Sequence, residues 1–211
     1  MHITRLELRQ FRNYEQAELC PCEGVTVLYG NNAQGKTALL EAIVLCCTGR
    51  SHRTSRDKEL IRWGQEAGRV FVQAEKRDGS HEVEMLLSSL RRKTVKVNGS
   101  ALQRTGELMG HVNGVLFAPE DLRMVKDGPA ERRRFIDMEL SQIKPSYYYA
   151  LQHYAHALMQ RNKLLRDIAL KPSLSDMLED WDAQLARYGA ALVLVCASIV
   201  IISRAQHQGS H

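Results

Sequence analysis

Alternating apolar and polar side chains open the sequence and predict paired strands. Residues 3–11 and 14–19 both alternate, as strands do when one of their faces is buried. Residues 25–29 are apolar, β-branched or aromatic and predict a buried strand, whereas residues 38–45 lack Gly and Pro and predict a helix. A glycine-rich segment therefore lies between a predicted strand and a predicted helix.

Further along the chain, two turn signals divide alternating segments into hairpins. Residues 69–75 and 81–86 flank an Asp-Gly pair at 78–79, and residues 94–97 run into an Asn-Gly pair at 98–99. Both dipeptides favour the backbone twist of tight hairpin turns. These segments predict an antiparallel β-rich insertion.

The later part of the sequence becomes helical after a core-type strand predicted at 112–117. Pro129 suits the first turn of a helix over 131–142. Apolar side chains then recur at spacings of three and four, which predicts two long helices that pack side by side. The second of these stripes consists of Leu178, Trp181, Leu185, Tyr188, Leu192, Val195, Ile199 and Ile202.

A phosphate-binding loop (P-loop) is the strongest chemical signal, because the glycine-rich segment matches G-x-x-x-x-G-K-[ST]. Glycine lets main-chain N–H groups approach phosphates at a helix N-terminus, which favours anions. Lys36 would add positive charge at the β- and γ-phosphates, and the Thr37 hydroxyl would bind Mg²⁺. The predicted nucleoside triphosphate site consists of Gly30, Asn31, Asn32, Ala33, Gln34, Gly35, Lys36 and Thr37.

Basic residues form three clusters in a chain whose formal net charge is +5. The first cluster contains Arg50, Arg53, Arg56, Lys58 and Arg62. The second, on a predicted hairpin, contains Arg91, Arg92, Lys93 and Lys96, and the third, which opens a helix, contains Arg132, Arg133 and Arg134. One such cluster can be a solvated face, but three in a P-loop protein favour nucleic acid as the partner, bound without sequence preference.

Composition places the chain in a broad class. Its 211 residues, 44% of them hydrophobic, are enough to bury a core. No charged-then-apolar leader opens the sequence, and the apolar run from Ala190 to Ile202 is too short for a bilayer span. We therefore expect a cytoplasmic protein without membrane contact.

Several segments, in order along the chain, resemble the bacterial RecF family of recombination proteins. They are Leu6-Glu7-Leu8-Arg9-Gln10-Phe11-Arg12-Asn13-Tyr14, the P-loop with Leu40-Glu41-Ala42-Ile43, Ser51-His52-Arg53-Thr54, Phe117-Ala118-Pro119-Glu120-Asp121-Leu122, Gly128-Pro129 and Arg132-Arg133-Arg134-Phe135-Ile136-Asp137. The resemblance implies an α/β fold: a P-loop ABC-type ATPase head, similar to those of SMC proteins. Residues 1–128 would form an ATP-binding lobe with an antiparallel β insertion, and residues 129–211 an incomplete α-helical lobe.

The resemblance also implies partners and further site residues. A RecF-like protein binds ATP with Mg²⁺, binds single- and double-stranded DNA, forms an ATP-dependent homodimer, and works with RecO and RecR to support RecA loading in repair, replication restart and SOS induction. Arg12 and Asn13 fall where related heads contact the nucleotide, and Glu120 falls near the magnesium-binding loop between lobes. The expected DNA contacts are Arg91, Arg92, Lys93, Arg132, Arg133 and Arg134.

Two motifs of ABC-type heads are missing from the sequence: the strand that ends in Asp-Glu, and the Ser-Gly-rich signature loop. In the RecF family both lie in the C-terminal part. We therefore expect the N-terminal portion of a RecF-like protein, with very slow or no ATP turnover by itself.

Two other interpretations stay open. The chain could be a different P-loop enzyme, such as a small-molecule kinase or a GTPase, although residues 162–165 (Asn-Lys-Leu-Leu) lack the aspartate of the guanine-reading Asn-Lys-x-Asp signature. It could also be a non-catalytic module that binds DNA or protein partners through its basic face and helical seam.

Overall fold

A computed structural model describes residues 1–118 and 128–208 of the chain, with side chains up to Ser198. The chain divides into two compact units, Met1–Ile143 and Lys144–His211. The boundary expected from the sequence lay between residues 128 and 129. The helix α3, Pro129–Ile143, therefore falls in the first unit rather than in the second.

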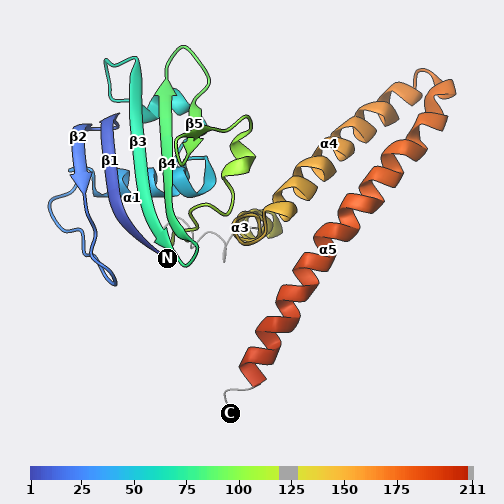
Figure 1. Ribbon diagram of the computed structural model, residues 1–211. Coiled ribbons are helices and arrows are strands. Elements are labelled where there is room, and N and C mark those ends of the chain that lie inside the picture. The colour runs from blue at the N-terminus through green and yellow to red at the C-terminus, as the bar shows by residue number, and fades with distance from the viewer. Residues whose placement is uncertain (119–127, 209–211) are drawn as a thin grey trace. The chain divides into compact units, whose positions relative to one another are not determined.

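A six-stranded antiparallel sheet forms the first unit, with the strand order β2-β1-β3-β4-β5-β6 (Figure 1). Its strands are β1 His2–Phe11, β2 Tyr14–Leu19, β3 Ala67–Lys76, β4 Gly79–Ser88, β5 Thr94–Val97 and β6 Ser100–Ala101. The paired N-terminal strands and the antiparallel insertion predicted from the sequence are confirmed. Asn98 and Gly99 have φ angles of 48° and 79°, the left-handed conformation that a tight hairpin turn requires of both central residues.

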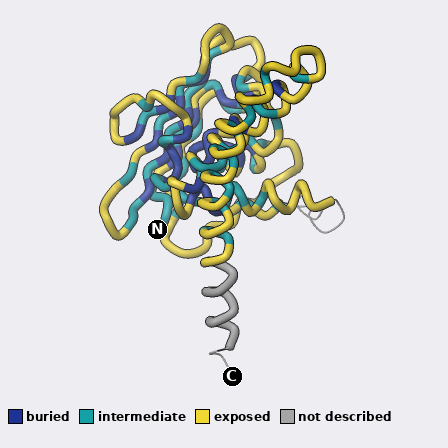
Figure 2. The backbone as a smooth tube through the Cα atoms, turned by 90° about the vertical axis from the view of Figure 1, so that its right-hand side faces the viewer, coloured by how far each residue is buried: buried dark blue, intermediate teal, exposed yellow. Residues whose placement is uncertain are grey.

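Successive strand residues point to opposite sides of the sheet. The buried strand residues lie on one of these two faces. Helix α1, Lys36–Thr48, covers the buried face, and Figure 2 shows the buried positions concentrated in the first unit. The shared core includes Leu6, Leu8, Val70, Val72, Val83, Met85, Ala42 and Leu45. The opposite face carries ion pairs that cross the strands, among them Arg69 with Glu7 and with Glu84.

Two segments predicted as core strands are not strands. Residues 25–29 and 112–117 have no strand assignment, and Val25, Val27 and Tyr29 are 84%, 73% and 91% exposed. Their apolar composition favours a buried strand, but a strand also needs a neighbour for its N–H and C=O groups. Every described strand pair of the sheet is antiparallel and excludes both segments.

The second unit is a pair of long helices, as predicted: α4 Pro145–Ile168 and α5 Leu178–Gln208. A short 3₁₀ turn, η4 Pro172–Met177, joins them. The helices contact each other through the stacked rings of His153 and Tyr188, whose centroids are 4.8 Å apart. None of the described helices has the combination of length and apolarity needed to cross a membrane.

Candidate nucleotide site and basic surface

The P-loop leads into α1 through backbone conformations that its glycines permit. Gly30 and Gly35 have φ angles of 141° and 97°, and Ala33 between them is also left-handed, at 64°. Helix α1 begins directly after Gly35, at Lys36. The predicted junction of loop and helix is therefore present without the paired strand that was expected before it.

Lys36 folds back onto its own loop. Its Nζ donates hydrogen bonds of 2.7 Å to the carbonyl oxygens of Gly30 and of Asn31. The ammonium is thus held against the loop, where a polyphosphate could replace the two carbonyls as its partner. Thr37 is exposed in the first turn of α1, so its hydroxyl is open to solvent.

The turn between β1 and β2 lies against the P-loop. A Cβ atom on Gly35 would come within 2.7 Å of both Asn13 Nδ2 and the Tyr14 side chain. The Tyr14 hydroxyl also donates a long, 3.4 Å hydrogen bond to the carbonyl of Gln34. Asn13 therefore lies beside the nucleotide loop, its contact with nucleotide stays a prediction, and only glycine fits at position 35.

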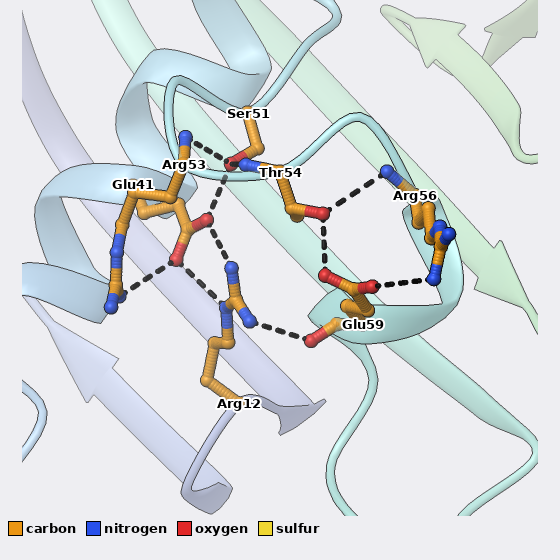
Figure 3. A network of polar contacts seen from close by, with 7 residues as sticks. All are labelled: Arg12, Glu41, Ser51, Arg53, Thr54, Arg56 and Glu59. Atoms are coloured by element: carbon orange, nitrogen blue, oxygen red, sulfur yellow. Dashed lines mark hydrogen bonds and ion pairs between the residues drawn. The ribbon is translucent and has the colours of Figure 1, made fainter.

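Arg12 points to a buried carboxylate, Glu41 of α1, rather than into solvent (Figure 3). Its Nε donates to Glu41 Oε2 at 2.8 Å and its Nη2 donates to Oε1 at 2.6 Å, a bidentate pair. Its Nη1 donates to the carbonyl of Glu59 at 2.7 Å. Arg12 therefore ties the end of β1 to the P-loop helix and to the 3₁₀ turn η1, Asp57–Leu60.

Glu41 is fully buried, yet it remains ionised near neutral pH. Burial alone would raise the pKa of its carboxyl group. Hydrogen bonds from Arg12 and Ser51, together with the positive charges of Arg12 and Arg53, outweigh burial and lower the pKa. The network continues through Thr54, whose hydroxyl donates to Glu59 at 2.6 Å (Figure 3).

The sequence carried a signal for this network that the prediction of site residues did not use. Ala38, Glu41, Ala42 and Leu45 follow the spacing of one helix face, and all four are buried. A carboxylate in such a stripe needs a cationic partner. The sequence does not reveal that the partner is Arg12, because it lies on a different element.

The basic clusters differ in how far their charges are already paired. In the first cluster, Arg53 pairs with Glu41, Arg56 with Glu59 and Arg62 with Glu15. In the second, Lys93 is bound to Asp57 at 2.8 Å and Lys96 to Glu84 at 3.0 Å. Arg91 and Arg92 are exposed and form no ion pair within the described residues.

The third cluster, Arg132, Arg133 and Arg134, lies in the N-terminal part of α3 and is exposed. These arginines likewise have no ion pair in residues 1–118 and 128–208. The helix dipole is unfavourable to positive charge near a helix N-terminus and its effect fades beyond the first turn, so it gives these arginines no stabilisation. Helix stability therefore does not explain their placement, whereas an anionic ligand would.

The predicted metal ligands are only partly described. Thr37 is accessible at the start of α1, as a Mg²⁺ ligand must be. Glu120 lies outside the described residues. The loop, its lysine and its hydroxyl fit a magnesium-bound polyphosphate, because together they offer main-chain N–H groups, one ammonium and one oxygen ligand.

Comparison with known proteins agrees with this geometry. A family model described as an AAA domain matches residues 5–156. The DNA replication and repair protein RecF of Acetivibrio thermocellus is 43% identical over 193 residues, which cover 92% of this chain and 52% of that protein. The protein of the same name from Ruminiclostridium cellulolyticum is 42% identical over 212 residues, 100% of this chain and 57% of its own length.

Solved structures give the same grouping. The structure described as the recombination mediator protein RecF-ATP in the RecFOR pathway superposes with a TM-score of 0.87 at 38% identity, over 94% of this chain and 54% of that one. An SMC ATPase structure, at 21% identity and a TM-score of 0.55, shares the fold alone, over 65% of this chain and 98% of that one. This chain spans about half the length of the curated relatives it matches. It belongs to the AAA domain family and, within that family, groups with the RecF-type DNA replication and repair proteins.

Proposed function

We propose that this chain binds ATP with Mg²⁺ and that bound nucleotide controls its attachment to DNA during recombinational repair and replication restart. The observation that carries the proposal is the P-loop, with Lys36 and Thr37 at the start of α1. The 38% identical structure described as RecF-ATP supports ATP as the nucleotide.

Each residue of the loop has a distinct role in this proposal. The main-chain N–H groups of residues 30–35 hold the phosphates, Lys36 exchanges its two carbonyl partners for phosphate oxygens, and Thr37 binds Mg²⁺. The metal, when bound, neutralises charge on the phosphates. Arg12 uses three contacts on Glu41 and Glu59, and a guanidinium has further N–H groups with which it could reach the nucleotide.

DNA is the proposed macromolecular partner because two clusters of the same unit contain exposed arginines that form no ion pair with any residue that the structure describes. These are Arg91 and Arg92 on the β4–β5 loop and Arg132, Arg133 and Arg134 on α3. Such residues neutralise phosphates irrespective of base sequence. Assembly with RecO and RecR, an indirect effect on RecA, and an ATP-dependent homodimer follow from the family and belong to the proposal for the whole protein.

Substitution of Lys36 tests nucleotide binding. Lys36→Ala should weaken the affinity for a fluorescent ATP analogue with Mg²⁺ by 100-fold or more, about 3 kcal/mol, because a charge-assisted contact to phosphate is lost. Thermal unfolding should change little, since Lys36 contributes no core side chain. Lys58→Ala removes the same charge from an exposed position and serves as the control. Equal affinity in the wild type and Lys36→Ala would refute the proposal.

DNA retention measured with and without ATP separates the alternatives. The proposed function predicts DNA binding that depends on nucleotide in the wild type and loses this dependence in Lys36→Ala. Nucleotide-independent retention by both proteins would favour a non-catalytic DNA-binding module. Displacement of labelled ATP by GTP at equal or lower concentration, without DNA binding, would favour another P-loop enzyme.

A further inference from the structure

We infer that Trp63 is a stacking platform for an unpaired base of single-stranded nucleic acid, with Arg91 and Arg92 positioned to bind neighbouring phosphates. The inference rests on the proposed function, in which DNA is the partner, and it adds a residue-level site for a single strand. None of these three residues belongs to the nucleotide loop.

Trp63 is exposed to an unusual degree. Its relative accessibility is 98%, although an indole ring is among the most strongly hydrophobic side chains. It sits in a tight turn in which the Gln65 N–H donates to the Arg62 carbonyl at 3.0 Å and Gly64 adopts a φ of 82°. The turn therefore directs the ring away from the core.

The backbone beneath the ring is firmly held. Leu60 and Ile61 are buried at 0% and 6% exposure, and Ile61 forms a β-bridge with Phe11. The Arg62 N–H donates to the Gln10 carbonyl at 2.9 Å. Trp63 is thus presented by a fixed scaffold, which lowers the entropy lost when a ligand binds to it.

The basic β4–β5 loop lies at the same end of the sheet. The N–H of Ser89 donates to the Glu66 carbonyl at 2.9 Å, so this loop is joined to the segment that follows Trp63. The loop is ordered at its start by the Ser88 hydroxyl, which accepts from the Arg91 N–H at 3.2 Å, and at its end by the pair of Lys93 with Asp57.

These features together favour a single strand over other ligands. Every base offers a ring face for stacking, and stacking on an aromatic side chain is tolerant of sequence. Arg91 and Arg92 add charge complementary to a phosphate backbone, because neither forms an ion pair within the described residues. In a duplex the ring faces are already stacked, so an exposed indole selects unpaired bases.

The intrinsic fluorescence of Trp63 tests the inference directly. The chain has only two tryptophans, so Trp181→Phe leaves Trp63 as the sole indole. Titration of this variant with an oligothymidylate should quench its fluorescence at saturation. In the otherwise wild-type chain, the Trp63→Ala substitution should weaken oligothymidylate binding about 5- to 150-fold, the range measured for loss of one stacked base. Trp63→Phe should restore part of the affinity.

Loss of Arg91 and Arg92 should change the salt dependence of binding. Arg91→Ala with Arg92→Ala should reduce the slope of log affinity against log salt by about 1.4, because each lost phosphate contact on a single strand accounts for about 0.7. Trp63→Ala should leave that slope unchanged. Arg77→Ala with Arg104→Ala removes the same charge from exposed residues outside the clusters and should leave the slope near the wild-type value.

Three results would overturn the inference. They are unquenched Trp63 fluorescence at saturating oligothymidylate, equal affinity in Trp63→Ala and wild type, and concentration-dependent self-association that Trp63→Ala abolishes, which would make Trp63 part of a contact between copies of the chain. If Trp63→Ala and wild type bind with equal affinity but DNA binding by the wild type still depends on ATP, the stacking inference fails and the proposed function stands. Absence of any DNA binding by the wild type would overturn both.

Discussion

Arginine serves two opposite purposes in the first unit. Arg12 lies over a buried carboxylate and donates two hydrogen bonds to it, whereas Arg132, Arg133 and Arg134 extend into solvent without an ion pair in the described residues. Removing one partner of a buried pair leaves an uncompensated charge, but removing an exposed arginine leaves only water. The comparison predicts that one set controls stability and the other controls ligand affinity.

Glu41→Gln should have the largest effect on stability. It leaves Arg12 without its carboxylate partner, and we expect the free energy of unfolding to fall by about 3 kcal/mol, the lower end for a broken buried pair, since the Arg12 side chain remains 21% exposed. Chemical denaturation measures this. Glu18→Gln, which breaks an exposed pair with Arg5, should cost about 1 kcal/mol or less. Similar losses in both variants would contradict the comparison.

The acid stability of the same variant provides a second check. The pKa of Glu41 is lowered in the folded state, so the ionised carboxylate stabilises the fold at pH values above its unfolded pKa, near 4.5. That contribution is lost as the pH falls from about 4.5 through the folded pKa. Wild type should therefore lose stability below about pH 4.5 more steeply than Glu41→Gln. Parallel acid profiles would show that Glu41 does not titrate in this way.

Replacing Arg132, Arg133 and Arg134 together by alanine should affect DNA affinity and not stability. We expect the salt slope for a single strand to fall by up to about 2, because three contacts at about 0.7 each are removed. The melting temperature should stay the same or rise slightly, since the helix dipole no longer opposes these charges. The matched control is Arg77→Ala, Arg104→Ala and Lys163→Ala in one chain. An unchanged slope would assign the cluster to a solvated face.

Asp57→Ala should have the smallest effect, and in the opposite direction. It releases Lys93 from its only ion pair within the described residues. DNA affinity should rise by less than about threefold at low salt, with a salt slope larger by up to about 0.7. Lower affinity would indicate that the pair orders the β4–β5 loop for binding, and that Lys93 contributes through the loop rather than through its charge.

Local chemistry allowed much of this molecule to be predicted. The Asn-Gly turn fixes its hairpin because few residues adopt the left-handed conformation at both central positions. The β3–β4 hairpin forms where it was predicted, but its turn is centred on Arg77 and Asp78, since Gly79 already pairs with Lys76. The P-loop is recognisable because its spacing is contiguous. The site residue Glu41 was not predicted, since its partner Arg12 is 29 positions away along the chain. The pairing of Lys93 with Asp57 joins residues 36 positions apart and was missed for the same reason.

The sequence by itself determined the antiparallel hairpins, the nucleotide loop, the two long helices and the sign of the surface charge, because each depends on neighbouring residues. Only the tertiary structure decided which charges are free and which apolar segments are buried. Val25, Val27 and Tyr29 are exposed despite their composition, whereas the equally apolar Val70 and Val72 are fully buried. The physical reason is that burial and ion pairing require a partner surface, and that surface comes from residues distant in the sequence.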